Sequence, residues 1–166
     1  MPIKLDWISI LRRGILFNYK FYARCTKILK TYGGKLTTAP AAADTIMQHL
    51  KDTGKQPSDY DMILTGDLGA LGSRIVKDLT WEKGYDISKV HVDCGEIIYK
   101  VVESEFQGGS GAGCSATVLN SYILTKMQAG LYKRILFAAT GALLSTVSSG
   151  QGESIPAICH AVELEL

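Results

Sequence analysis

The sequence predicts a layered α/β domain with a mostly parallel sheet, and two observations lead to this prediction. Short apolar segments that end in glycine-containing turns alternate with amphipathic helical segments, which is the pattern of parallel strands joined by crossover helices. The 166 residues are 46% hydrophobic and 20% charged, so the chain can bury a core and is not disordered. This length corresponds to one domain, or to part of a larger one.

The first predicted helix spans residues 40–53. Pro40 suits a position in the first turn, Asp44 lies near the positive N-terminal end, and Gly54 ends the helix. The helical spacing of three apolar residues predicts the buried face, formed by Ile46, Met47 and Leu50.

The next elements are assigned from apolar runs and their bounding turns. Residues 60–65 predict a buried strand that ends in a sharp turn at residues 66–69, and residues 71–83 predict a second helix. Residues 89–94 predict another strand, and residues 96–102 predict a further extended segment.

A glycine-rich loop at residues 108–116 leads into a helix predicted over residues 117–129. Residues 134–140 form the clearest buried strand, followed by a Ser- and Gly-rich loop at 141–152 and a closing extended segment at 155–163. The predicted inner side of the 117–129 helix consists of Val118, Tyr122, Ile123 and Met127.

The glycine-rich turns lie next to strand ends, and ligands of open α/β sheets bind at the carboxyl ends of the strands. The loop at residues 108–113 is expected to act through its backbone, either by close packing or by offering N–H groups to a carboxylate. The candidate ligand-binding residues are Gly66, Asp67, Gly109, Ser110, Gly111 and Cys114.

Charge is distributed unevenly along the chain. Residues 1–36 carry eight basic residues and one acidic residue, whereas residues 37–166 carry ten basic and 15 acidic residues. This difference separates a basic, apolar segment at 1–32 from the remainder at 33–166. The segment 1–32 could pack as an edge element, lie on a membrane surface, or form a poorly ordered leader. The net charge of +2 does not indicate a nucleic-acid partner.

Three motifs suggest other chemistries. The spacing of Gly109, Gly111 and Cys114 lacks the third glycine of a dinucleotide-binding loop. His91 and Cys94 are three residues apart, but no other residue shows the companion spacing that a zinc site needs, so no metal is expected. Cys114 at a helix start would have a lowered thiol pKa, and His160 is the one later histidine that could serve it as a base. The alternative for Cys114 is a small buried residue packed against glycine.

Several long stretches resemble a known family. These are TAPAAADTIMQHL, DYDMILTGDLGALG, DCGEIIY, GGSGAGCSA, LYKRILFAATGALLS and ESIPAICHAVEL. On these stretches, the chain from about Gly33 to its end resembles the C-terminal half of the stage V sporulation protein AD family, which has the thiolase-like fold. The segment 1–32 does not resemble the family.

The resemblance implies one half of a thiolase-like fold, a mixed, mostly parallel sheet with helices on both faces. It implies a sporulation protein linked to the binding of dipicolinic acid, as its calcium chelate, and to its uptake into the developing spore. The expected partners are a separate N-terminal thiolase-like half or a second copy, together with membrane transport proteins of the spore. The expected location is the cytoplasm of the forming spore, either free or at the periphery of its inner membrane. No cofactor is expected.

The resemblance also implies that the chain is not an enzyme. Condensing enzymes of this fold carry a His at the turn that corresponds to residues 65–67 and an Asn or second His at residues 109–111. This chain has neither, so the groups that handle protons and the thioester oxygen are missing. The alternative is a degenerate condensing enzyme that recruits Cys114 or His160.

An isolated half is expected to expose an apolar helix layer and therefore to associate. The helices at 40–53 and 114–129 are the expected contact surfaces, through the small residues Ala41, Ala42, Ala43, Ala116 and Ala129.

Overall fold

The computed structural model describes residues 26–27, 38–98, 108–142, 147, 151 and 156–166, and every structural statement below refers to these residues. The alternatives for the segment 1–32 lie almost entirely outside the described residues. So do residues 99–102 of the predicted extended segment and most of the predicted loop at 141–152.

Five strands form one sheet in the order β1-β5-β4-β2-β3. β2 pairs in parallel with both β3 and β4, whereas β5 pairs antiparallel with β4 and with β1. Every strand except β5 therefore runs in the same direction, which confirms the prediction of a mixed, mostly parallel sheet. The strands are β1 (Thr26–Lys27), β2 (Met62–Thr65), β3 (His91–Asp93), β4 (Arg134–Ala142) and β5 (Pro156–Glu165).

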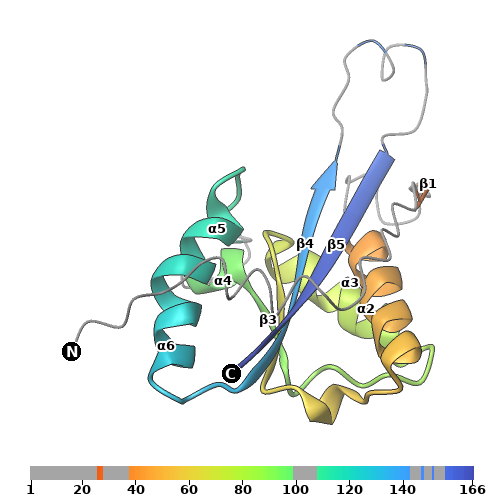
Figure 1. Ribbon diagram of the computed structural model, residues 1–166. Helices are drawn as coiled ribbons and strands as arrows, with labels where there is room; N and C mark the ends of the chain where they lie inside the picture. The colour runs from red at the N-terminus through yellow and green to blue at the C-terminus, as the bar shows by residue number, and fades with distance from the viewer. Residues whose placement is uncertain (1–25, 28–37, 99–107, 143–146, 148–150, 152–155) are drawn as a thin grey trace.

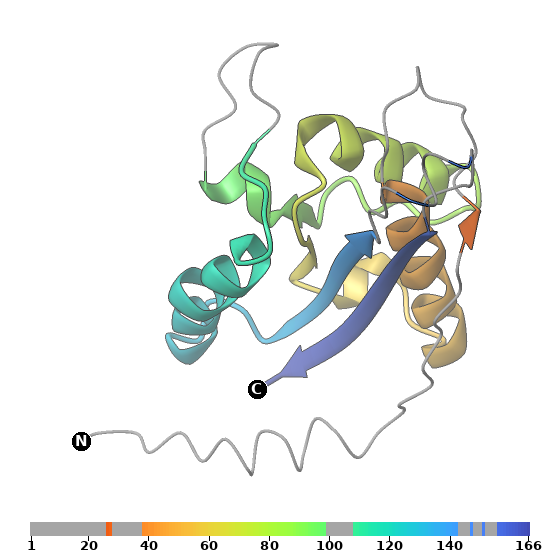
Figure 2. The ribbon, with the colours of Figure 1, turned by 90° about the horizontal axis from the view of Figure 1, so that it is seen from above.

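Helices lie on both faces of this sheet, as predicted (Figure 1, Figure 2). α2 and α3 cover one face, and α5, η2 and α6, which follow one another without a break, pack against the other. The helical segments are α2 (Ala39–Thr53), η1 (Pro57–Asp59), α3 (Gly69–Trp81), α4 (Cys94–Ile98), α5 (Cys114–Val118), the π-helical turn η2 (Leu119–Ile123) and α6 (Leu124–Gln128).

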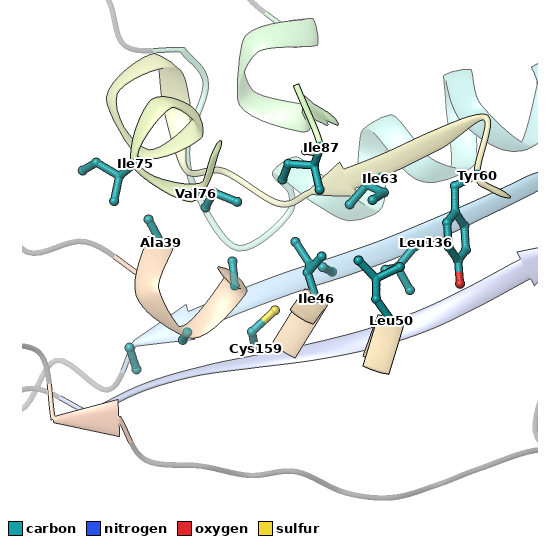
Figure 3. Close-up of a cluster of buried hydrophobic side chains, with 14 residues drawn as sticks. Ala39, Ile46, Leu50, Tyr60, Ile63, Ile75, Val76, Ile87, Leu136 and Cys159 are labelled. Carbon is teal, nitrogen blue, oxygen red and sulfur yellow. The ribbon is translucent and has the colours of Figure 1, made fainter. Parts of the chain in front are cut away.

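The strands divide their apolar side chains between two cores because successive residues of a strand point to opposite faces. Ile63 packs with α2 and α3, as does Leu136, whereas Leu64 and Ile135 pack with the α5–α6 helix. Figure 3 shows the first core, in which Ile46 and Leu50 of α2 and Val76 of α3 meet the strands.

Helix α2 confirms part of its prediction. Pro40 lies in the first turn, and Gly54 ends the helix with a φ of +68°, a conformation that favours glycine. The role given to Asp44 was wrong, because the first turn contains no acidic residue. The buried alanines of its first turns, which include Ala39, Ala41, Ala42 and Ala43, instead fix this end of α2 against the core. The last three are therefore not available for the intermolecular contact predicted for them.

Two further predictions were wrong. Residues 96–98 are not extended but belong to α4, which begins directly after β3. The helix predicted over 117–129 begins at Cys114, and its π-helical turn shifts the buried side by one residue. The buried positions are Cys114, Val118, Ile123 and Met127, so Tyr122 turns outward and is 43% exposed.

Candidate functional site

The carboxylate of Asp93, at the end of β3, fixes the turns that follow two neighbouring strands. Its Oδ1 accepts hydrogen bonds from the Thr65 hydroxyl at 2.7 Å and from the Leu68 N–H at 3.0 Å. Its Oδ2 accepts from the N–H groups of Gly69 and Gly95, both at 3.0 Å. The side chain is fully buried, and four donors satisfy its charge. The N–H groups at the start of α3 therefore donate their hydrogen bonds to Asp93.

His91 continues this network in the neutral state. The Thr65 hydroxyl donates to Asp93, so the contact of 3.1 Å between Thr65 Oγ1 and His91 Nε2 requires the imidazole to donate from Nε2. Burial, and secondarily the charge of Lys77, lower the pKa of His91 to about 3. Its Nδ1 is buried and has no hydrogen-bond partner. His91 is thus a positioning residue for Thr65.

Asp67, in the turn after β2, joins this turn to the glycine-rich loop. Its Oδ2 accepts hydrogen bonds from the Ser110 hydroxyl at 2.9 Å and from the Gly111 N–H at 3.1 Å. Ser110 and Gly111 are exposed, so the carboxylate of Asp67 lies at the surface of the cluster.

The glycine-rich loop also contacts α4 through backbone atoms alone. The Gly109 N–H donates to the Gly95 carbonyl oxygen at 2.8 Å. A Cβ on Gly95 would lie less than 3.0 Å from the Gly109 carbonyl oxygen, which is closer than Cβ atoms in proteins approach other heavy atoms. A Cβ on Gly108, whose φ is +120°, would meet the Gly95 carbonyl group at 2.9 Å. Close backbone approach is therefore one role of this loop.

Cys114 lies beneath these contacts, with its Sγ 3.8 Å from the carbonyl oxygens of Gly66 and Gly109. The expected lowering of its thiol pKa was wrong. Burial raises the pKa, and the carboxylates of Asp67 and Asp93 add to the increase. His160 lies on β5, paired across the ladder with Ala139 of β4.

The six predicted site residues therefore lie together, and we call them the strand-end cluster: Gly66, Asp67, Gly109, Ser110, Gly111 and Cys114. Their role in ligand binding remains a prediction. Asp93 was not predicted as a site residue, although it ends a strand at the same edge of the sheet as the turn that contains Asp67. Thr140 of β4 was not predicted either; its Oγ1 is buried without a hydrogen-bond partner, and its backbone lies close to Gly66.

A second polar network, which the sequence analysis also missed, surrounds Glu163 of β5. Glu163 accepts hydrogen bonds from Tyr60 at 3.0 Å and from Lys55, and it pairs with Arg134 at 3.4 Å. Burial alone would raise the pKa of Glu163, but its bonds to Lys55 and Tyr60 outweigh burial and lower this pKa. Burial lowers the pKa of His49, an effect that Glu163 partly offsets. This network joins α2, β4 and β5 away from the strand-end cluster.

Comparisons with known proteins agree with the resemblance seen in the sequence. The family model described as "Stage V sporulation protein AD (SpoVAD)" matches residues 31–165. The curated "Stage V sporulation protein AD" of Bacillus subtilis (strain 168) is 50% identical over 127 residues, which cover 76% of this chain. The chain belongs to the stage V sporulation protein AD family. It spans 38% of the length of this Bacillus subtilis relative.

None of the helices in the described part of the chain is both long and apolar enough to cross a membrane.

Proposed function

We propose that this chain is a non-catalytic component of spore formation whose strand-end cluster takes part in binding dipicolinic acid during its uptake into the developing spore. One observation carries this proposal: the turn after β2 and the loop before α5 meet at the carboxyl ends of β2 and β3, through Asp67 and its two donors. Ligands of open α/β sheets bind at such strand ends. The family relationship supplies the sporulation context.

The charge of the cluster favours the calcium chelate over the free diacid. Dipicolinate alone is a dianion, and the carboxylate of Asp67 at the surface of the cluster would repel it. In the one-to-one calcium chelate this charge is neutralised, and a carboxylate oxygen can approach the metal ion of the ligand. Asp67 would therefore select the chelated form.

The state of Cys114 argues against the alternative, a degenerate condensing enzyme. A nucleophilic cysteine needs a lowered pKa or an adjacent base. Cys114 is buried, its thiol contacts two carbonyl oxygens, and its pKa is raised. The thiolate that would attack a thioester is therefore scarce at neutral pH.

The proposed partners and location rest on the family relationship. The chain spans 38% of its Bacillus subtilis relative, so we place the rest of the ligand pocket on an N-terminal thiolase-like half. The assembled protein would act with membrane transport proteins of the spore, on the cytoplasmic side of the forming spore's inner membrane.

Calorimetric titration tests the binding proposal. The chain, alone and mixed with the N-terminal portion of the Bacillus subtilis relative, is titrated with dipicolinate in the presence of calcium or of a calcium chelator. We expect heat of binding from the mixture with calcium and little without it. Asp67→Asn should reduce this preference for the chelate, and Asp78→Asn, an exposed residue of α3, is the control for charge. Equal binding of both forms by the unchanged protein would contradict the role given to Asp67, and no binding under any condition would contradict the function.

An acyl-transfer assay tests the non-catalytic part of the proposal. Acetyl-CoA with malonyl-CoA, and acetoacetyl-CoA alone, are incubated with the same chain and mixture. No turnover by the chain is expected. Turnover by the chain that is lost in Cys114→Ala, with the fold unchanged by circular dichroism, would establish the condensing enzyme instead.

A further inference from the structure

The carboxylate of Asp67 is held in one orientation although it lies close to the surface. Asp67 is half-buried, and its two donors, Ser110 and Gly111, are exposed. Both hydrogen bonds end on the same oxygen, Oδ2, at 2.9 Å from the Ser110 hydroxyl and 3.1 Å from the Gly111 N–H. Within the described part of the chain, Oδ1 of Asp67 accepts no hydrogen bond. The carboxylate therefore has a fixed orientation and one oxygen whose bonding capacity is unused.

The backbone on both sides of this contact is fixed as well. The N–H groups of Leu68 and Gly69, directly after Asp67, donate to the buried Asp93, both at 3.0 Å. The glycine-rich loop is tied to α4 by the 2.8 Å backbone hydrogen bond from the Gly109 N–H. A side chain at the surface normally samples several rotamers and loses this freedom when it binds a ligand. For Asp67 most of that loss has already occurred on folding.

We propose that Ser110 is a positioning residue for the calcium chelate of dipicolinate, because its hydroxyl holds Asp67 so that Oδ1 coordinates the calcium ion of the ligand. This inference rests on the proposed function, to which it adds the atom that meets the metal and the residue that orients it. Calcium accepts a carboxylate through one or both oxygens. Because two donors occupy Oδ2, coordination through Oδ1 alone fits this carboxylate. Carboxylates that bind metal ions are commonly oriented by such hydrogen bonds.

Direct contact between Ser110 and a carboxylate of dipicolinate is the alternative role for this residue. A serine hydroxyl has one proton to donate, and Ser110 donates it to Asp67. A carboxylate of the ligand only accepts hydrogen bonds, so it would have to compete with Asp67 for this proton. Ser110 is therefore expected to act on the ligand through Asp67.

A double-mutant cycle measured by calorimetric titration separates these two roles. The chain is mixed with the N-terminal portion of the Bacillus subtilis relative and titrated with dipicolinate in the presence of calcium. Ser110→Ala should weaken binding about tenfold in the unchanged chain, the lower end of the effect of such orienting groups. In the Asp67→Asn background the same substitution should have no effect, because the group that Ser110 orients no longer binds the metal.

Two further variants serve as controls. Ser110→Thr keeps the hydroxyl and should bind the chelate as tightly as the unchanged chain does. Ser121→Ala removes another exposed hydroxyl, which donates to the Thr117 carbonyl oxygen at 2.7 Å, and should leave the affinity unchanged. Urea unfolding should give the same midpoint for Ser110→Ala as for the unchanged chain, since its hydrogen bond is exposed.

Three results would overturn the positioning role alone. These are an unchanged affinity in Ser110→Ala, an equal loss from this substitution in both backgrounds, and a loss that Ser110→Thr does not restore. Absence of binding by the unchanged chain in the mixture would instead contradict the proposed function, and the positioning role with it. The two failures are therefore distinguishable in one set of titrations.

Discussion

The backbone contact between Gly95 and Gly109 makes Gly95→Ala a decisive substitution. An added Cβ would approach the Gly109 carbonyl oxygen closer than 3.0 Å and would lie 3.0 Å from Asp93 Oδ2. Because the first of these atoms belongs to the backbone, it cannot rotate away as the end of a side chain could. The loop must therefore move, and the 2.8 Å hydrogen bond from the Gly109 N–H to the Gly95 oxygen is strained or lost.

The magnitude follows from three contributions to the free energy of unfolding. Overpacking against a backbone atom costs about 3 kcal/mol, the upper part of the usual range. The weakened hydrogen bond costs about 1 kcal/mol. Alanine favours the helical conformation of α4 over glycine by about 1 kcal/mol. The net expectation is a loss of about 3 kcal/mol.

Urea unfolding followed by circular dichroism measures this loss. Gly113→Ala is the matched control, since its nearest contact would be Thr117 Oγ1 at 4.0 Å and its φ is −92°. The control should stay within about 1 kcal/mol of the unchanged protein. The Gly109 amide should also exchange hydrogen faster in Gly95→Ala alone. If the two variants unfold within about 1 kcal/mol of each other, the close backbone approach is not a constraint on this fold.

Three further substitutions test the polar networks by urea unfolding. Below pH 6.5, His91 becomes protonated in the unfolded chain, whereas its pKa in the folded protein is about 3. The free energy of unfolding should therefore fall by about 1.4 kcal/mol for each pH unit below 6.5. His91→Gln should remove this part of the pH dependence. Because the pKa of Glu163 is lower in the folded protein, its carboxylate stabilises the fold above the unfolded pKa of 4.5, and this stabilisation is lost as the pH falls. Glu163→Gln should therefore lower the free energy of unfolding by about 2 kcal/mol at neutral pH and by little in acid. Asp93→Asn should cost about 3 kcal/mol or more, because an amide cannot accept four hydrogen bonds; a loss below 1 kcal/mol would contradict this account of the two turns.

The sequence predicted the sheet and most of the helices because their signals are local. Residues 60–65 and 134–140 are apolar runs bounded by turns; the first contains β2, and the second lies within β4, which continues to Ala142. Gly54 ends α2 as expected. The π-helical turn was not predicted, since a period of 3.6 residues places both Tyr122 and Ile123 on the side of Val118. Ile123 is buried as predicted, whereas Tyr122 is exposed.

The candidate site was predicted in position but not in its internal chemistry. The expectation that turns next to strand ends lie close together was correct for Asp67 and the glycine-rich loop. Three hydrogen bonds of Asp93 join residues that are 24 to 28 positions apart in the chain. No local sequence pattern predicts which donors a carboxylate will bind over such a separation. The same is true of Cys114, where local helix geometry predicted a lowered pKa but burial and two distant carboxylates raise it.

The polar groups around the strand-end cluster are largely used to hold this chain together. Asp93 accepts hydrogen bonds from the N–H groups at the start of α3, and Asp67 accepts hydrogen bonds from Ser110 and Gly111. The described part of the cluster thus presents an already fixed negative charge and an exposed loop, with few donors left for the carboxylates of a diacid. Under the proposed function, we expect the donors for those carboxylates to come from the N-terminal portion of the family protein. We therefore expect the mixture of the two portions to bind the calcium chelate at least tenfold more tightly than this chain alone, a difference of about 1.4 kcal/mol that titration resolves. Equal affinity with and without the N-terminal portion would show that this chain supplies those donors itself.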